Sequence, residues 1–147
     1  MMKNRNIYIV AGTFYKELSS NLIQGAQGIL DSVLDDNNLT IIKVPGAFEI
    51  PGMVKQIIDI HNPDLIITLG VLIKGETAHF EYISESVVHS IANLSISSNI
   101  PIVFGVLTTY DYEQAFKRAD VNQLNNGGEV MSTLLDMLEI YSQIKNK

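Results

Sequence analysis

The chain has 147 residues, of which 46% are hydrophobic and 18% are charged, and its formal net charge at pH 7 is −6. Residues 1–147 are therefore expected to form a single compact domain rather than a disordered chain. The acidic balance argues against nucleic acid as a partner, because a protein that binds the phosphate backbone needs a basic face to displace counterions.

The absence of cysteine excludes disulfides and thiolate metal sites, and it favours a cytoplasmic location. The apolar run near the N-terminus, residues 7–12, is short and leads into polar residues, so we expect no signal peptide. The longest apolar run, residues 65–73, is about half of the roughly 18 residues that a membrane span requires. We therefore expect no membrane association.

Short β-branched runs alternate along the chain with stretches in which hydrophobic residues recur every three or four positions. The runs have the composition of parallel strands buried on both faces, and the stretches have that of amphipathic helices. In chain order the predicted elements are strand 7–11, helix 18–34, strand 40–44, helix 50–58, strand 65–73, helix 80–94, strand 102–107, helix 111–119 and helix 130–141. This alternation predicts an α/β fold, a three-layer αβα sandwich around a four-stranded parallel sheet.

Small, polar and aromatic residues follow each of the four predicted strands. Ligands of open parallel sheets bind beyond the carboxyl ends of the strands, so these four exits are expected to meet around one crevice. The exits are GTFY at 12–15, VPGAFEIP at 44–51, IKGETAHFEY at 73–82 and FGVLTT at 104–109.

The second exit supports two interpretations. In one, Pro45 and Gly46 form an ordinary turn, Phe48 belongs to the core and Glu49 is a solvated carboxylate. In the other, Gly46 and Ala47 let a ligand approach the backbone, Phe48 packs against a flat ring and Glu49 accepts hydrogen bonds from hydroxyl groups. The segment by itself leaves both open.

The third exit places Gly75, Glu76 and Thr77 just before a helix that is predicted to begin near His79. Free N–H groups and the helix dipole attract an anion such as phosphate there, although Thr77 is equally suited to be a plain N-cap. The dipole disfavours an imidazolium, so His79 is either a neutral proton-transfer group or an ordinary surface histidine. His79 and Glu81 also spell H-x-E, but the zinc deaminase pattern requires paired cysteines, so we expect no metal.

The short helix after the fourth strand carries Glu113, Lys117 and Arg118. Such a group usually forms an exposed, charge-paired helix face. Arg118 nevertheless follows the strand exit closely enough to reach the rim of the crevice and hold a phosphate with its planar guanidinium.

The segments VPGAFEIP, LGVLIKGETAHFEY, PIVFGVLTTYDYEQAFKRA and NNGGE resemble the lumazine synthase family in order and spacing, from about residue 7 to residue 141. The resemblance implies a flavodoxin-like topology and a transferase of riboflavin biosynthesis that uses neither metal nor cofactor. Its reaction joins 5-amino-6-(D-ribitylamino)uracil to 3,4-dihydroxy-2-butanone 4-phosphate. The products are 6,7-dimethyl-8-ribityllumazine, phosphate and water.

The resemblance also implies roles for individual residues. His79 and Arg118 are the implied catalytic residues, for proton transfer and for phosphate binding respectively. Phe14 is implied to stack on the pyrimidine, and Phe104 to come from a neighbouring subunit. The other implied substrate contacts are Ala47, Phe48 and Glu49 for the ribityl chain and ring, the backbone of Val71, Leu72 and Ile73 for the ring, and Glu76 and Thr77 for the phosphate.

The chain departs from the family pattern at three places. Thr13 and Tyr15 flank Phe14 where many members have arginine and asparagine, and Lys74 stands where arginine is frequent. Asn126 replaces the lysine of the family's Asn-Lys-Gly segment. Because a cation near the phosphate is lost, we expect weaker binding of the butanone phosphate.

The resemblance further implies a homopentamer with sites at subunit interfaces, and it leaves a sixty-subunit shell and an association with riboflavin synthase open. Two alternatives to the enzyme are a non-catalytic module that binds flavin or ribityl ligands and a shell-forming protein on the same fold. His79 and Arg118 together favour the enzyme, because a binding module has little use for a proton shuttle. Polar residues at all four strand exits argue against a purely structural protein.

Overall fold

The structure is a computed structural model that describes residues 5–33 and 37–147. The first predicted helix was expected to end at Leu34, which lies outside the described residues. Residues 1–4, which precede the apolar run that was considered for a signal peptide, also lie outside them. In chain order the elements are β1 (Arg5–Gly12), α1 (Lys16–Val33), β2 (Asn37–Val44), a short 3₁₀ helix η1 (Ala47–Glu49), α2 (Ile50–Ile60), β3 (Leu65–Ile73), α3 (His79–Ser97), β4 (Ile102–Thr109), α4 (Tyr112–Ala119) and α5 (Asn126–Lys145).

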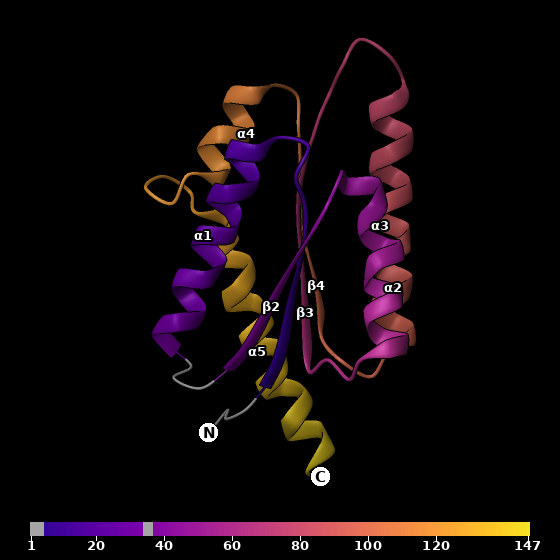
Figure 1. The fold of residues 1–147 in the computed structure, drawn as a ribbon, viewed down its shortest axis with the longest axis vertical. Coiled ribbons are helices and arrows are strands. Elements are labelled where there is room, and N and C mark those ends of the chain that lie inside the picture. The colour runs from indigo at the N-terminus through magenta and orange to yellow at the C-terminus, as the bar shows by residue number, and fades with distance from the viewer. Residues whose placement is uncertain (1–4, 34–36) are drawn as a thin grey trace.

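The four strands form one parallel sheet in the order β2-β1-β3-β4. This arrangement confirms the predicted four-stranded α/β sandwich with flavodoxin-like topology. Figure 1 shows α1, α4 and α5 on one side of the sheet and α2 and α3 on the other. None of the helices within the described ranges is both long and apolar enough to cross a membrane.

Two hydrophobic cores hold the layers together, one on each face of the sheet. On the first face, Leu22 of α1 and Met131 of α5 pack with the side chains of β1 and β3. On the second face, Val54 of α2 and Ile91 of α3 pack with the opposite faces of the same strands. The central strands are therefore buried on both faces, as their unbroken apolar sequences predict.

The second strand is less buried than the sequence predicts. Among the side chains that the structure describes in β2, only Val44 is buried. The reason is its position: β2 is an edge strand whose single neighbour in the sheet is β1. An apolar run therefore identified the strand correctly but not its place in the sheet.

Two glycines allow backbone segments to approach closely. A Cβ at Gly12 would lie 2.9 Å from the carbonyl carbon of Gly46, so this glycine lets the first and second strand exits touch. A Cβ at Gly127 would lie 2.8 Å from the carbonyl carbon of Leu22, so the start of α5 rests directly on α1. Close helix packing thus accounts for the first glycine of the NNGGE segment.

Candidate active site

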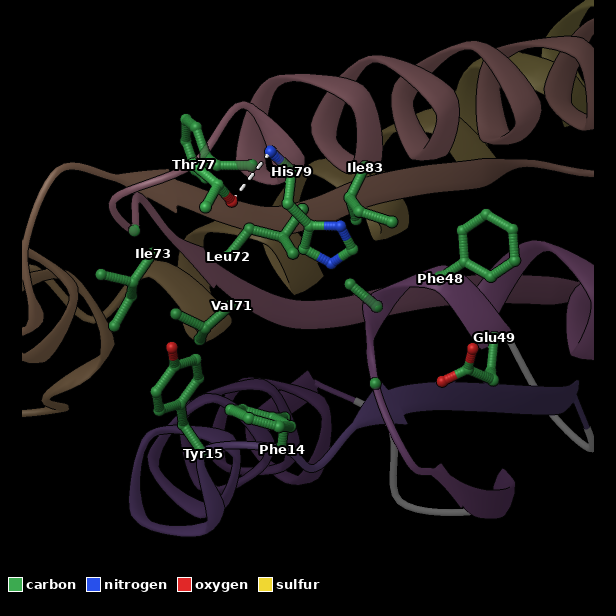
Figure 2. A pocket seen from close by; sticks show the side chains of 14 residues that line it. Phe14, Tyr15, Phe48, Glu49, Val71, Leu72, Ile73, Thr77, His79 and Ile83 are labelled. Atoms are coloured by element: carbon green, nitrogen blue, oxygen red, sulfur yellow. Dashed lines mark hydrogen bonds between the residues drawn. The ribbon is translucent and has the colours of Figure 1, made fainter.

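The exits of β1, β2 and β3 meet around one pocket of about 510 Å³. Figure 2 shows Phe14 and Tyr15 on one side of it, Phe48 and Glu49 on another, and His79 and Ile83 on the side formed by α3. The pocket thus joins segments that are far apart in the chain, as the rule for open parallel sheets predicts. Its lining residues are Phe14, Tyr15, Gly46, Ala47, Phe48, Glu49, Val71, Leu72, Ile73, Gly75, Thr77, His79, Phe80 and Ile83.

The first exit combines a fixed backbone with a projecting ring. The backbone N–H and the hydroxyl of Thr13 both donate to the carbonyl of Val44, at 2.9 and 3.1 Å. The hydroxyl of Ser19 donates to the carbonyl of Gly12. Phe14 follows these anchors, and its side chain is 74% exposed. The turn therefore presents an aromatic face to any ligand in the pocket.

The second exit forms the 3₁₀ helix η1, in which the N–H of Glu49 donates to the carbonyl of Gly46 at 3.2 Å. Phe48 is 57% exposed and lines the pocket together with Glu49. The interpretation that Phe48 belongs to the core is therefore wrong. An exposed carboxylate beside an exposed ring suits a ligand that carries both hydroxyl groups and a flat ring.

The third side of the pocket is the carboxyl end of β3. The pairing of β1 with β3 stops at Ala11 and Leu69, whereas the pairing of β3 with β4 continues to Ile73. Within the described strands, the edge of β3 that faces β1 is therefore unpaired beyond Leu69, where Val71, Leu72 and Ile73 line the pocket. Backbone N–H and C=O groups on such an edge can bind the polar rim of a heterocycle.

Thr77 and His79 bring polar groups to the start of α3. The hydroxyl oxygen of Thr77 accepts a hydrogen bond from the backbone N–H of His79 at 3.3 Å, as the dashed line in Figure 2 marks. The N-cap of α3 is Ala78, which has no side-chain cap, so the alternative that Thr77 is a plain N-cap is wrong. Thr77 lies one residue earlier, and its own hydroxyl hydrogen remains available to a ligand. The imidazole of His79 lies in the pocket near Leu72 and Ile83.

Two charged residues of the third exit do not line the pocket. Glu76 is exposed and lies outside the lining, although Gly75 and Thr77 belong to it. The ammonium group of Lys74 lies 3.7 Å from a carboxylate oxygen of Glu81 and 5.7 Å from the centre of the Tyr110 ring. Lys74 therefore lies outside the pocket lining, beside Glu81 and Tyr110, where exposed contacts of this kind contribute little to stability.

The fourth exit does not join the pocket within this chain. Phe104 and Arg118 line a separate hollow of about 530 Å³ along β4, together with Asn126. The guanidinium of Arg118 donates to the carbonyl of Gln114 at 3.0 Å. Because β4 is the edge strand opposite β2, this hollow lies at the border of the sheet, and the expectation that all four exits share one crevice is wrong for a single chain.

Some lining residues were not among the expected substrate contacts. Tyr15 follows Phe14 directly, and Phe80 and Ile83 belong to the hydrophobic stripe of α3. The spacing contains a signal for Ile83, because residues four apart on a helix lie on the same face, and Ile83 is four residues after His79. No sequence signal distinguished Tyr15 from an ordinary core aromatic.

The titratable groups of the pocket are few. Its lining contains one imidazole, from His79, one carboxylate, from Glu49, and the phenol of Tyr15. Within the described ranges, no three histidine, aspartate or glutamate side chains are close enough to share a metal ion. The arrangement can therefore stack a ring, bind hydroxyl groups, attract an anion to the start of α3 and exchange protons.

Comparison with known proteins supports a relationship over nearly the whole chain. The sequence model of the 6,7-dimethyl-8-ribityllumazine synthase family matches residues 4–142. The chain is 43% identical to the 6,7-dimethyl-8-ribityllumazine synthase of Leuconostoc mesenteroides, over 97% of this chain and 92% of that protein. It is 41% identical to the protein of the same name from Limosilactobacillus reuteri, over 97% and 93% of the two chains. It is 39% identical to the protein of the same name from Campylobacter jejuni, over 96% of this chain and 92% of that protein.

Proposed function

Since this chain belongs to the 6,7-dimethyl-8-ribityllumazine synthase family, we propose that it makes 6,7-dimethyl-8-ribityllumazine from 5-amino-6-(D-ribitylamino)uracil and 3,4-dihydroxy-2-butanone 4-phosphate. It is thus a transferase of riboflavin biosynthesis. The observation that carries this function is the convergence of Phe14, Glu49 and His79 on one pocket. A stacking ring, a carboxylate and an imidazole are the groups that a ribitylated pyrimidine and its proton transfers require.

The ribitylaminouracil occupies the part of the pocket between β1 and β3. The exposed ring of Phe14 stacks on the pyrimidine, and the unpaired edge of β3 at Val71, Leu72 and Ile73 binds its polar rim. Ala47, Phe48 and Glu49 hold the ring and the ribityl chain, with the Glu49 carboxylate as acceptor for hydroxyl groups. An exposed ring at one side of the pocket and a carboxylate at another suit a substrate with one flat end and one flexible, hydroxylated end.

The butanone phosphate binds at the start of α3. There the positive end of the helix dipole and the hydroxyl hydrogen of Thr77 favour an anion, and the backbone at Glu76 adds a donor. The 5-amino nitrogen of the uracil attacks the ketone, and loss of water leaves a Schiff base. Elimination then breaks the C–O bond to phosphate, and ring closure by the ribityl-bearing nitrogen releases a second water. His79 exchanges protons in these steps, which chiefly require orientation of the two substrates.

A single chain leaves the phosphate end of this site without a strong cation in its lining. Arg118 and Phe104 lie together in the hollow on the β4 edge, from which a second subunit can be reached. We therefore place the site between subunits of a homopentamer, with Arg118 and Phe104 given to the pocket of the neighbour. The sixty-subunit shell and an association with riboflavin synthase stay open, and the enzyme is placed in the cytoplasm.

Incubation of the purified protein with both substrates tests this function directly. We expect lumazine fluorescence to rise together with release of inorganic phosphate, each at the same rate. Binding of the ribitylaminouracil without either product would instead identify a ribityl-ligand binding module. Assembly into particles without binding of the uracil would identify a structural protein.

The oligomeric state is a separate measurement. Analytical ultracentrifugation of the purified protein is expected to give the mass of a pentamer or of a multiple of it. Mixing the variants His79→Ala and Arg118→Ala, assayed at a butanone phosphate concentration well below the KM of Arg118→Ala, tests the shared site, because mixed subunits restore some complete sites only if the two residues meet across an interface. A monomer with full activity would contradict the shared site.

A further inference from the structure

Three aromatic side chains form a row that runs from the lining of the pocket to the first turn of α4. The Phe14 and Tyr15 rings have their centres 4.9 Å apart at an interplanar angle of 75°, which is an edge-to-face contact. The Tyr15 and Tyr112 rings follow at 6.3 Å and 63°. We call Phe14, Tyr15 and Tyr112 the aromatic row.

The end of the row distant from the pocket is anchored to a second helix. The hydroxyl of Tyr112, in the first turn of α4, donates to a carboxylate oxygen of Glu17 in the first turn of α1, at 3.2 Å. Burial, together with the hydrogen bond to Glu17 and its negative charge, raises the pKa of the Tyr112 phenol. A phenol is protonated at neutral pH even at its ordinary pKa of 10.0, so Tyr112 can donate this hydrogen bond there.

The middle of the row is fixed by both its backbone and its ring. The carbonyl of Tyr15 accepts the N–H of Ser19 at 2.9 Å, so its backbone forms the start of α1. Its half-buried ring packs against the core shared by α1, α4 and α5. In Figure 2 the Tyr15 ring lies beside Phe14 on the same side of the pocket. Tyr15 is therefore a rigid element beside an exposed ring.

The Phe14 ring needs such a support. At 74% exposure, it is in contact with few side chains that could restrict its rotamer. A freely rotating ring would lose that freedom when a ligand binds, which lowers affinity. The edge-to-face contact with Tyr15 restricts the rotamer beforehand and leaves at least one face of the Phe14 ring open to a flat ligand.

We propose that Tyr15, held in place by Tyr112 and Glu17, is a positioning residue that fixes the Phe14 ring in the orientation required to stack on a heteroaromatic substrate. The identity of that substrate as the ribitylaminouracil rests on the proposed function. The Phe14 ring stacks on the ribitylaminouracil and not on the butanone phosphate. Loss of the Tyr15 contact should therefore weaken binding of the ribitylaminouracil alone. The aromatic row thus orders the ring site of this chain.

The test compares Tyr15→Ala with Tyr15→Phe in the full-length protein. Loss of the ring is expected to raise the KM for the ribitylaminouracil about tenfold, because an aromatic pair contributes on that order to affinity. The KM for the butanone phosphate should change by less than about twofold, since the phosphate end of the pocket is untouched. Tyr15→Phe keeps the edge-to-face contact and should restore the KM of the wild type.

A second readout does not depend on turnover. A ribitylaminouracil with a 5-nitro group in place of the 5-amino group cannot form the Schiff base, and its affinity is measured by calorimetry. We expect Tyr15→Ala to weaken its binding by about the same factor as the KM. The matched control is Tyr8→Ala, which removes a half-buried tyrosine in the middle of β1 that stacks on His61 and does not line the pocket.

The outcomes separate the positioning role from the proposed reaction. If the wild type binds the nitro compound but forms no lumazine, the reaction is refuted, and the affinity of Tyr15→Ala still decides the positioning role. Equal affinities of wild type and Tyr15→Ala would refute that role. So would a Tyr15→Ala protein that loses thermal stability as Tyr8→Ala does and shows equal rises in both KM values. If the wild type binds neither substrate nor nitro compound, both proposals fail.

Discussion

Replacement of Gly127 by alanine tests the close packing of α5 on α1. The added Cβ would lie 2.8 Å from the carbonyl carbon of Leu22 and 2.9 Å from its Cα, and both are backbone atoms that cannot rotate away. The two helices must separate to admit it, and overpacking of this kind costs about 1–3 kcal/mol. Alanine regains up to about 1 kcal/mol of helix propensity, and about half of that in a first turn, so the net loss is about 0.5–2.5 kcal/mol.

The matched control is Gly28→Ala, within α1. Nothing lies within 4 Å of a Cβ at Gly28, so only the propensity gain of about 0.5–1 kcal/mol remains. The two Gly→Ala changes are therefore expected to have opposite signs. For a domain of this size, 1 kcal/mol corresponds to a Tm change of roughly 2–4 °C.

Thermal unfolding followed by far-ultraviolet circular dichroism, at equal protein concentrations, measures both shifts. We expect Gly127→Ala to melt about 1–10 °C below the wild type and Gly28→Ala a few degrees above it. A Gly127→Ala protein that melts at or above the wild type would refute the reasoning, because it would mean that α5 does not rest on α1 as closely as the structure has it.

Three further predictions concern the site and its surroundings. His79→Ala should lower kcat by about 10² or more without changing assembly, and stopped-flow turnover with gel filtration checks both; an unchanged rate removes His79 from proton transfer. Arg118→Ala should chiefly raise the KM for the butanone phosphate, by about tenfold or more, while a change confined to the KM of the uracil would contradict its phosphate role. Hydrogen bonds from Gln123 and from the backbone of Asn122 lower the pKa of Asp120 below its ordinary value of 3.8. The ionised carboxylate therefore stabilises the fold at pH values above 3.8, and this stabilisation is lost as the pH falls through the lowered pKa. The stability difference between wild type and Asp120→Ala in urea titrations should therefore be constant near neutral pH and shrink below about pH 4; a difference that persists unchanged to pH 2 would contradict this.

Local sequence was sufficient for the elements of the fold. The β-branched runs correspond to β1, β2, β3 and β4, and the hydrophobic spacing corresponds to the helices, because both signals depend on neighbours a few residues apart. Where a prediction needed a distant partner it was less accurate. The low burial of β2 depends on which strands lie beside it in the sheet. The sequence of residues 40–44 does not indicate that β2 is an edge strand.

The same distinction applies to the site. Motifs identified Phe14, Glu49 and His79, and the parallel sheet explains why three exits that are far apart in the chain meet. The exit of β4 follows the same local rule, yet Arg118 and Phe104 line a different hollow. Phe104 lies within β4 and Arg118 on α4, and both line the hollow along the outer edge of β4, whereas the pocket is lined by the exits of β1, β2 and β3 and by α3.

The sequence by itself determined the alternation of strands and helices, the residue types at the carboxyl ends of the strands and the family to which the chain belongs. These properties are local, or are repeated in relatives. Only the tertiary structure decided that Tyr15 meets Tyr112 across 97 positions of the chain, that Lys74 faces Glu81, and that Arg118 lies apart from His79. Contacts of this kind depend on how helices pack across a twisted sheet, and that packing sums interactions from the whole chain.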